Sequence, residues 1–468
     1  MQSNSRTLAS LFLVMCLSWA VHAWAGPQIS ALNPPDRIQF SSFASALAIA
    51  GDIDGDQIPD YVVGAYNQSA GGNEHQGRAF VFSGRTNKLL FTLDNPFPQP
   101  NAAFGFSVAA AGDVNQDGVP DLLVGAFGQG EKGSALALVM GWSDGQGGLQ
   151  NVTKQVGSGQ AFVFSGKDGR HLYALEAPHQ HAGAGFGWSV ASLGDVTADG
   201  IRELVVGAQG QDGAGRAFVF DGHDGRLLLT LAPPTDTERA GFGWSVANAG
   251  DINQDGLTDI LVGAPYSTVD GRSVQGRGYV FSAKDGTVLL TLDDPQPQAG
   301  ASFGGCVRSA GDLNKDDIPD ILIGAPYQDV GVHTAQGAAF AYSGKDGAVL
   351  LTLHDPVSRP QAGFGWSLAA STDVNTDGTP EILVGAPFQS VDEFHVQGEV
   401  FLYNGRDGRH LITFDDPYPH QGAMFGYTLA TPGDTNGDAI PEFVFGTPGQ
   451  HLGDTVAVGR VFTFVSAR

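Results

Sequence analysis

The chain has 468 residues, of which 42% are hydrophobic and 16% charged, and its formal net charge is −25. The hydrophobic fraction is sufficient for a packed core. The acidic balance, with no basic patch, argues against nucleic acid and anionic membranes as partners, because both carry negative charge.

The first 25 residues have the pattern of a cleaved export signal. Arg6 supplies a positive start, Leu8–Ala20 is apolar, and Ala23-Trp24-Ala25 resembles a small-residue cleavage site. Cleavage after Ala25 would start the mature chain at Gly26. An uncleaved anchor is the alternative, but the apolar run is short for a membrane span. We therefore expect a secreted or cell-surface protein, with the periplasm also open, and no transmembrane segment in the mature chain.

One cysteine, Cys306, remains after this cleavage, so no internal disulfide can form. An exported protein without disulfides needs another source of stability, and bound metal is a natural candidate.

Seven acidic loops divide the rest of the chain, with first residues spaced by 61, 82, 56, 61, 61 and 61 positions. In each loop the first, third, fifth and ninth positions carry oxygen-bearing side chains. These are Asp52, Asp54, Asp56 and Asp60; Asp113, Asn115, Asp117 and Asp121; Asp195, Thr197, Asp199 and Glu203; Asp251, Asn253, Asp255 and Asp259; Asp312, Asn314, Asp316 and Asp320; Asp373, Asn375, Asp377 and Glu381; and Asp434, Asn436, Asp438 and Glu442. A fixed period of this length indicates a repeat architecture.

Every unit has the same order of elements. A Phe-Gly step opens an apolar segment, the acidic loop follows, and a β-branched run then ends in Gly-Ala-Pro or a related triplet. A polar loop leads to a third apolar run, a tight turn and a fourth run. The Gly, Asp and Pro residues between these runs predict four short strands per unit, and no helical period is present.

Seven units of four strands predict an all-β fold, a seven-bladed β-propeller with four antiparallel strands per blade. Because a closed ring cannot be divided without opening an edge, we expect a single domain over residues 26–468. The last unit stops after its third strand, Gly459–Phe464. Ile29–Leu32 has the sequence position of the missing fourth strand, so we predict that it completes the last blade and closes the ring.

These motifs resemble the FG-GAP repeats of the integrin α-subunit head and its prokaryotic relatives, over essentially all of residues 28–468. The Phe-Gly and Gly-Ala-Pro steps carry the resemblance, for example Phe242-Gly243 and Gly263-Ala264-Pro265. Phe43-Ala44 lacks the Gly, and Gly64-Ala65-Tyr66 lacks the Pro. No counterpart of integrin leg domains, membrane span or inserted ligand-binding domain is found in the sequence. The resemblance thus implies the fold and calcium, and not integrin signalling.

The loop chemistry also favours calcium. Side-chain oxygens at positions one, three, five and nine, with a backbone carbonyl at seven, suit a hard cation, and a flexible oxygen-only loop favours Ca²⁺ over Mg²⁺. The alternative is that the Asp residues only form Asx turns. We predict up to seven Ca²⁺ ions, bound best in the loops starting at Asp113, Asp251 and Asp373. The loops starting at Asp52 and Asp434 are expected to be weakest, because Gln57 and Ala439 replace the turn glycine.

Each acidic loop should join the first two strands of its blade, which places two other sets of connections on the opposite face. In the resembled family that face binds ligands, so calcium is expected to be structural here. The function expected is an extracellular protein- or glycan-binding adhesion module with no catalytic residues assigned; the alternative is a polysaccharide lyase or hydrolase.

Three further features have two interpretations each. Recurrent aromatic residues are either blade-to-blade packing or a sugar platform at the channel mouth: Phe106, Trp188, Trp244, Trp366 and Tyr427. Loop histidines are either solvated or part of a metal or acid–base site: His75, His179, His181, His333, His395 and His420. An insertion of about twenty residues between Ala126 and Gln160 is either an extra hairpin or a docking surface.

Overall fold

The structure is a computed structural model that describes residues 28–130, 136–142, 149–155, 157–234 and 238–465. The export signal expected over residues 1–25 lies outside this range. Among the described residues, no helix is both long and apolar enough to cross a membrane.

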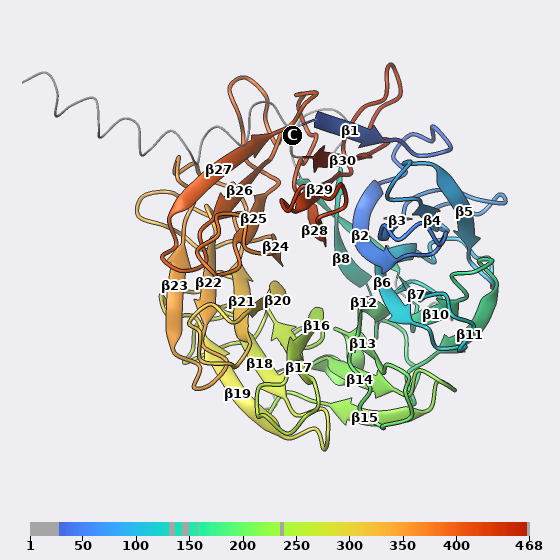
Figure 1. Cartoon of the computed structure of the whole chain (residues 1–468), viewed down its shortest axis with the longest axis horizontal. Coiled ribbons are helices and arrows are strands. Elements are labelled where there is room, and N and C mark those ends of the chain that lie inside the picture. Colours follow the sequence, from blue (N-terminus) through green and yellow to red (C-terminus); the bar gives the residue numbers. More distant parts are fainter. Residues whose placement is uncertain (1–27, 131–135, 143–148, 156, 235–237, 466–468) are drawn as a thin grey trace, which may run out of the picture.

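Seven four-stranded antiparallel sheets are arranged around a central axis, as Figure 1 shows. The strands of successive blades are β2 (Phe43–Gly51), β3 (Asp60–Ala65), β4 (Arg78–Phe82) and β5 (Leu89–Asp94); β6 (Phe104–Gly112), β7 (Asp121–Ala126), β10 (Gln160–Phe164) and β11 (His171–Leu175); β12 (Phe186–Ser192), β13 (Leu204–Ala208), β14 (Arg216–Phe220) and β15 (Leu227–Leu231); β16 (Ser245–Gly250), β17 (Asp259–Ala264), β18 (Arg277–Phe281) and β19 (Val288–Asp293); β20 (Cys306–Gly311), β21 (Asp320–Ala325), β22 (Ala338–Tyr342) and β23 (Val349–Leu353); β24 (Ser367–Ala370), β25 (Ile382–Ala386), β26 (Glu399–Tyr403) and β27 (His410–Asp415); and β28 (Thr428–Gly433), β29 (Glu442–Thr447), β30 (Arg460–Val465) and β1 (Gln28–Leu32). The predicted seven-bladed propeller is confirmed.

The two ends of the chain share the last blade. Strand β1 pairs antiparallel with β30, and Ile29 lies opposite Phe464 in the register. Figure 1 shows the blue β1 beside the red β30. Leu32 is only 2% exposed, so the strand contributes a core side chain as well as backbone hydrogen bonds. The predicted closure of the ring by Ile29–Leu32 is confirmed.

The insertion in the second blade forms its own two-stranded sheet from β8 (Leu136–Trp142) and β9 (Leu149–Gln155). An extra hairpin was one of the two interpretations of this segment. A 3₁₀ turn, η2 (Gln211–Gly213), lies between β13 and β14.

The core lies between neighbouring blades, where sheets pack face to face. The phenylalanine of each Phe-Gly step is fully buried, as is Phe43 before Ala44. Each ring contacts aromatic side chains of the third strand of its own blade; the Phe104 ring lies 5.8 Å from Phe162 and 5.7 Å from Phe164 between centroids. The Phe of the motif is therefore a core anchor of the blade.

Close backbone contact between blades explains the two glycine motifs. A Cβ on Gly64, in the second strand of the first blade, would lie 1.9 Å from the carbonyl oxygen of Gly105 in the next blade. Gly105 itself has φ +83°, and its Cβ would lie 2.3 Å from the carbonyl oxygen of Arg78. Glycine avoids both contacts, whereas a side chain would push the blades apart; in the first blade the position of Gly105 is held by the smallest side chain, Ala44, at φ +69°.

We therefore expect Gly105→Ala to destabilise the protein much more than Gly72→Ala. Gly72 has a similar φ of +84° but open space around it, so it reports backbone strain alone. That strain costs about 1–2 kcal/mol, and the clash at Gly105 adds about 1–3 kcal/mol or more. Urea unfolding of both variants in excess calcium measures the difference. Equal losses of stability would contradict the close-contact explanation.

Candidate metal loops and axial cavity

The seven acidic loops follow the first strand of each blade and precede the second, as expected. The first-position carboxylate is turned inward in every loop and accepts backbone N–H groups from positions five and six. In the second loop, Asp113 accepts from Asp117 at 2.9 Å and from Gly118 at 2.9 Å. The Asx-turn bonding that was the alternative to metal binding is thus present, and it aims the carboxylates into the loop.

The ninth-position carboxylate is fully buried in all seven loops. Its oxygen accepts the N–H of position two, as Asp60 does from Ile53 at 2.7 Å. Where this residue is Asp, its second oxygen also accepts a backbone N–H from the turn between strands three and four. For example, Gly84 N donates to Asp60 Oδ1 at 2.9 Å. The residue thus holds the acidic loop against a second turn of the same blade.

A glutamate at position nine behaves differently because it is one methylene longer. Its second oxygen accepts from the position-three side chain: Thr197 Oγ1 donates to Glu203 at 3.0 Å, and Asn436 Nδ2 donates to Glu442 at 2.7 Å. Among the aspartates at position nine, Asp121 accepts the same kind of bond, from Asn115 Nδ2 at 3.1 Å.

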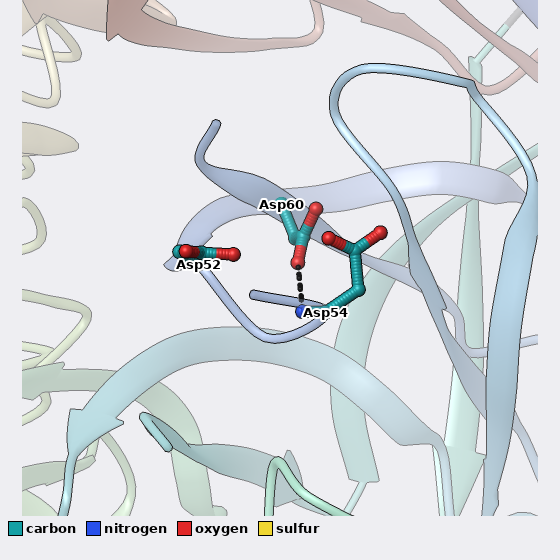
Figure 2. Close-up of side chains that lie close together, drawn as sticks. All are labelled: Asp52, Asp54 and Asp60. Atoms are coloured by element: carbon teal, nitrogen blue, oxygen red, sulfur yellow. Dashed lines mark hydrogen bonds between the residues drawn. The ribbon is translucent and has the colours of Figure 1, made fainter. Parts of the chain in front are cut away.

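Four loops bring three carboxylates together, each offering an oxygen within 4.8 Å of the others. The groups are Asp52, Asp54 and Asp60; Asp195, Asp199 and Glu203; Asp373, Asp377 and Glu381; and Asp434, Asp438 and Glu442. Figure 2 shows the first group, with the Asp52 and Asp54 side chains on either side of Asp60. Such oxygen-only groups fit a hard divalent cation.

The side chains at positions three and nine explain why the carboxylates converge in these four loops. Three of the groups have Glu at position nine, and the fourth has an extra carboxylate, Asp54, at position three. The loops starting at Asp113, Asp251 and Asp312 have Asn and Asp at these two positions. The four loops whose carboxylates converge are therefore not the ones expected from the turn glycine to bind calcium best. The expected order of calcium affinity stays a prediction.

Burial raises the pKa of the ninth-position acids. The pKa is raised to about 6 for Asp121, Asp259 and Asp320 and to about 7 for Glu381, with loss of hydration as the main cause and backbone N–H groups opposing it. A buried acid that resists ionisation becomes a stable carboxylate when a cation supplies the missing charge.

This gives a pH prediction with opposite signs for the two metal states. In metal-stripped protein the folded state holds protons that the unfolded chain releases, so the free energy of unfolding falls as pH rises from about 4 to about 7. In calcium, protons compete with the ion, so stability falls as pH falls over the same range. Melting temperatures across this range, with and without calcium, measure both slopes. Parallel slopes would contradict the prediction.

The axis of the ring contains a cavity of about 530 Å³. It is lined by the start of the first strand of each blade, at the end away from the acidic loops. The recurrent aromatic residues line it and also contact one another between blades. Ring centroids lie 4.7 Å apart for Phe106 and Trp188, and 4.6 Å apart for Trp188 and Trp244. They are thus blade-to-blade packing, as one interpretation held, and part of a cavity wall.

Hydroxyl groups form a second ring beside the aromatic residues. Ser107 donates to the carbonyl oxygen of Gly187 in the next blade at 2.8 Å, and Thr428 donates to Ala44 at 3.1 Å across the point of ring closure. Equivalent bonds join other blades. Sequence patterns did not single out this ring.

The loop histidines are not brought together with the acidic groups. In the described residues, no group of three metal-capable side chains includes a histidine. His181 Nε2 accepts the N–H of Asp212 at 3.0 Å. His420 stacks on His451, with ring centroids 4.2 Å apart. These two side chains support loops on the face opposite the acidic loops.

Comparison with known proteins agrees with this architecture. The FG-GAP repeat matches residues 186–220, 242–281, 309–349 and 364–403, and an FG-GAP-like repeat matches residues 52–124. The chain is 29% identical over 245 residues to integrin alpha-11 of Homo sapiens, covering 50% of this chain and 20% of that protein. It is 32% identical over 231 residues to integrin alpha-5 of Xenopus laevis, covering 46% and 21%. The chain spans about a fifth of the length of these relatives.

The fold and the matched repeats define the class as a β-propeller built from blades with acidic loops. The chain is an FG-GAP repeat protein with an integrin-α-like propeller.

Proposed function

We propose that this chain is an exported, calcium-binding propeller that acts as an extracellular binding or adhesion module for a protein or glycan. The observation that carries the proposal is the division of the ring into two ends. One end has acidic loops whose carboxylates converge within 4.8 Å in four blades, and the other has a cavity of about 530 Å³. In this proposal calcium is structural and rigidifies the first end.

Calcium would be held by the side chains at positions one, three, five and nine of each loop. When bound, it would supply the positive charge that the converging carboxylates lack. The chain's own residues provide the frame: the position-nine acid, as with Asp60, fixes the loop against the blade, and the N–H bonds to the first Asp fix the curvature of the turn. Binding of the partner is assigned to the opposite end because that end holds the cavity, and loops positioned by a rigid scaffold commonly form binding sites.

A glycan array tests the binding function directly. We expect calcium-loaded protein to bind a defined subset of glycans or, on a parallel protein array, a defined protein, and metal-stripped protein to lose that binding. No selective binding in calcium on either array would contradict the proposal. Turnover of a polysaccharide that His181→Ala or His420→Ala abolishes would favour the enzymatic alternative.

Export is tested separately. We expect the protein recovered outside its producing cells to begin at Gly26, measured by intact mass. A product that retains residues 1–25 would contradict cleavage after Ala25.

A further inference from the structure

One charged side chain lines the axial cavity among the residues that the structure describes, and it is Arg308. Arg308 lies in β20, and the corresponding position of the other six blades is alanine: Ala48, Ala109, Ala191, Ala247, Ala369 and Ala430. A fold that needs only a methyl group in six blades therefore has a guanidinium in the seventh. Packing of the ring does not require this charge.

The aromatic wall is interrupted in the same blade. Gly305 occupies the position that is aromatic in five other blades, and Ser45 occupies it in the first blade. Blades one and five lie on different sides of the axis, as the positions of β2 and β20 in Figure 1 show. The two gaps in the aromatic ring thus place a small polar side chain on one side and a glycine, close to Pro326, in the strand of Arg308 on the other.

Both polar groups retain hydrogen-bonding capacity. Arg308 is exposed, and its Nη1 donates only to the carbonyl oxygen of Val307 at 2.8 Å. In the described part of the chain no carboxylate lies within ion-pairing distance of Arg308, although the protein has 49 acidic residues. Ser45 Oγ is buried and has no hydrogen-bond partner among the described residues. Because this oxygen is closed off from solvent, Arg308 is the one of the two groups that a ligand in the cavity can reach.

The cavity chemistry defines a ligand class. A guanidinium pairs best with a carboxylate, through two parallel N–H to oxygen bonds. The tryptophan, tyrosine and phenylalanine faces supply flat apolar surface, and the hydroxyl groups supply polar contacts between them. The volume lies within the range of about 300–1,000 Å³ that is usual for small-molecule pockets. A sugar ring with a carboxylate has all three features: an apolar face, hydroxyl groups and a negative charge.

We propose that the axial cavity binds an acidic sugar unit of the uronate type, with its carboxylate on Arg308 and its ring against the aromatic wall. This inference rests on the proposed function and names the ligand of that same module. It also assigns the binding site to the axis rather than to the outer loops.

Titration of the calcium-loaded protein with D-glucuronate tests the proposal. Three of the six tryptophans, Trp188, Trp244 and Trp366, line the cavity, so intrinsic fluorescence reports its occupation. D-glucose and acetate serve as matched probes that lack the carboxylate and the ring, respectively, all at fixed free calcium. Arg308→Ala is compared with Arg170→Ala, a control at an exposed turn on the outer side of the second blade.

We expect saturable binding of glucuronate, and at least tenfold weaker binding of glucose and acetate, because a charged hydrogen bond and a stacked ring each contribute roughly one order of magnitude. Arg308→Ala should lose about tenfold or more in glucuronate affinity, and Arg170→Ala should not change it. Unchanged melting temperatures of both variants in calcium establish that the fold is intact.

Three results would overturn the proposal: glucuronate affinity unchanged in Arg308→Ala, acetate binding as tightly as glucuronate, or no saturation by glucuronate in folded, calcium-loaded protein. Equal affinities for acetate and glucuronate would indicate that the ligand is a carboxylate without a sugar ring, such as an acidic side chain of a protein partner. Selective binding of neutral glycans or a protein on the arrays, without glucuronate binding, would leave the proposed function standing and reject this inference alone.

Discussion

Removal of calcium is expected to lower the melting temperature of the protein by more than about 10 °C. An ion that binds only the folded state adds about 2.7 kcal/mol per site when its concentration is a hundredfold above the dissociation constant. Four convergent acidic groups would then contribute on the order of 10 kcal/mol. The shift in melting temperature is about 2–4 °C per kcal/mol for a domain of about 150–250 residues and smaller for a larger one, so a loss of this size corresponds to more than about 10 °C here.

The structural reason is repulsion inside the loops. Asp373, Asp377 and Glu381 offer oxygens within 4.8 Å of one another, and Glu381 is fully buried. Without a cation these groups must repel one another or retain protons. Thermal melts in calcium, in chelator, and in chelator followed by excess Mg²⁺ measure the effect. We expect Mg²⁺ to restore less stability than Ca²⁺, because its octahedral geometry is more demanding. Identical melts in calcium and chelator would contradict the prediction.

Deletion of β1 is expected to have the second largest effect. A chain that starts at Asn33 would lose the pairing of Gln28–Leu32 with β30 and the buried Leu32 side chain. Loss of the buried Leu alone costs about 2–5 kcal/mol. The exposed edge of β30 would also be free to pair with another chain. We therefore expect several kcal/mol of destabilisation together with association.

Ile29→Ser provides the matched control for the deletion. Ile29 lies in the same strand but its side chain is 44% exposed, so the substitution keeps the ladder and should cost about 0.5 kcal/mol or less. Urea unfolding measures stability, and size-exclusion chromatography measures association. A deletion no more harmful than Ile29→Ser would mean that the last blade does not depend on the N-terminal strand.

Much of the fold could be predicted from the sequence because the information is local and repeated. Each acidic loop lies between two β-branched or apolar runs. Because the last unit contains only three strands, Ile29–Leu32 could be assigned as its fourth strand. The spacing alone also placed each loop between the first two strands of its blade. Repeats make such predictions robust, since each blade contacts mainly its neighbours.

The remaining features depend on contacts that no local pattern specifies. The bond from Gly84 to Asp60 joins two turns 24 residues apart, so the role of Asp60 as an anchor was not visible in its loop. The expected order of calcium affinity among the loops was based on the turn glycines. The convergence of the carboxylates depends instead on the side chains at positions three and nine. Arg308 was missed because its importance appears only when the first strands of all blades are compared around the axis.

Direct counting of bound metal tests the central claim, that the acidic loops bind calcium. Mature protein dialysed against millimolar calcium would be analysed for metal by mass spectrometry, beside a variant carrying Asp373→Ala and Asp377→Ala. We predict at least four and at most seven calcium ions per chain, from the four convergent groups and the seven loops, and one fewer in the variant. Fewer than four ions per chain, or the same number in both proteins, would contradict the account.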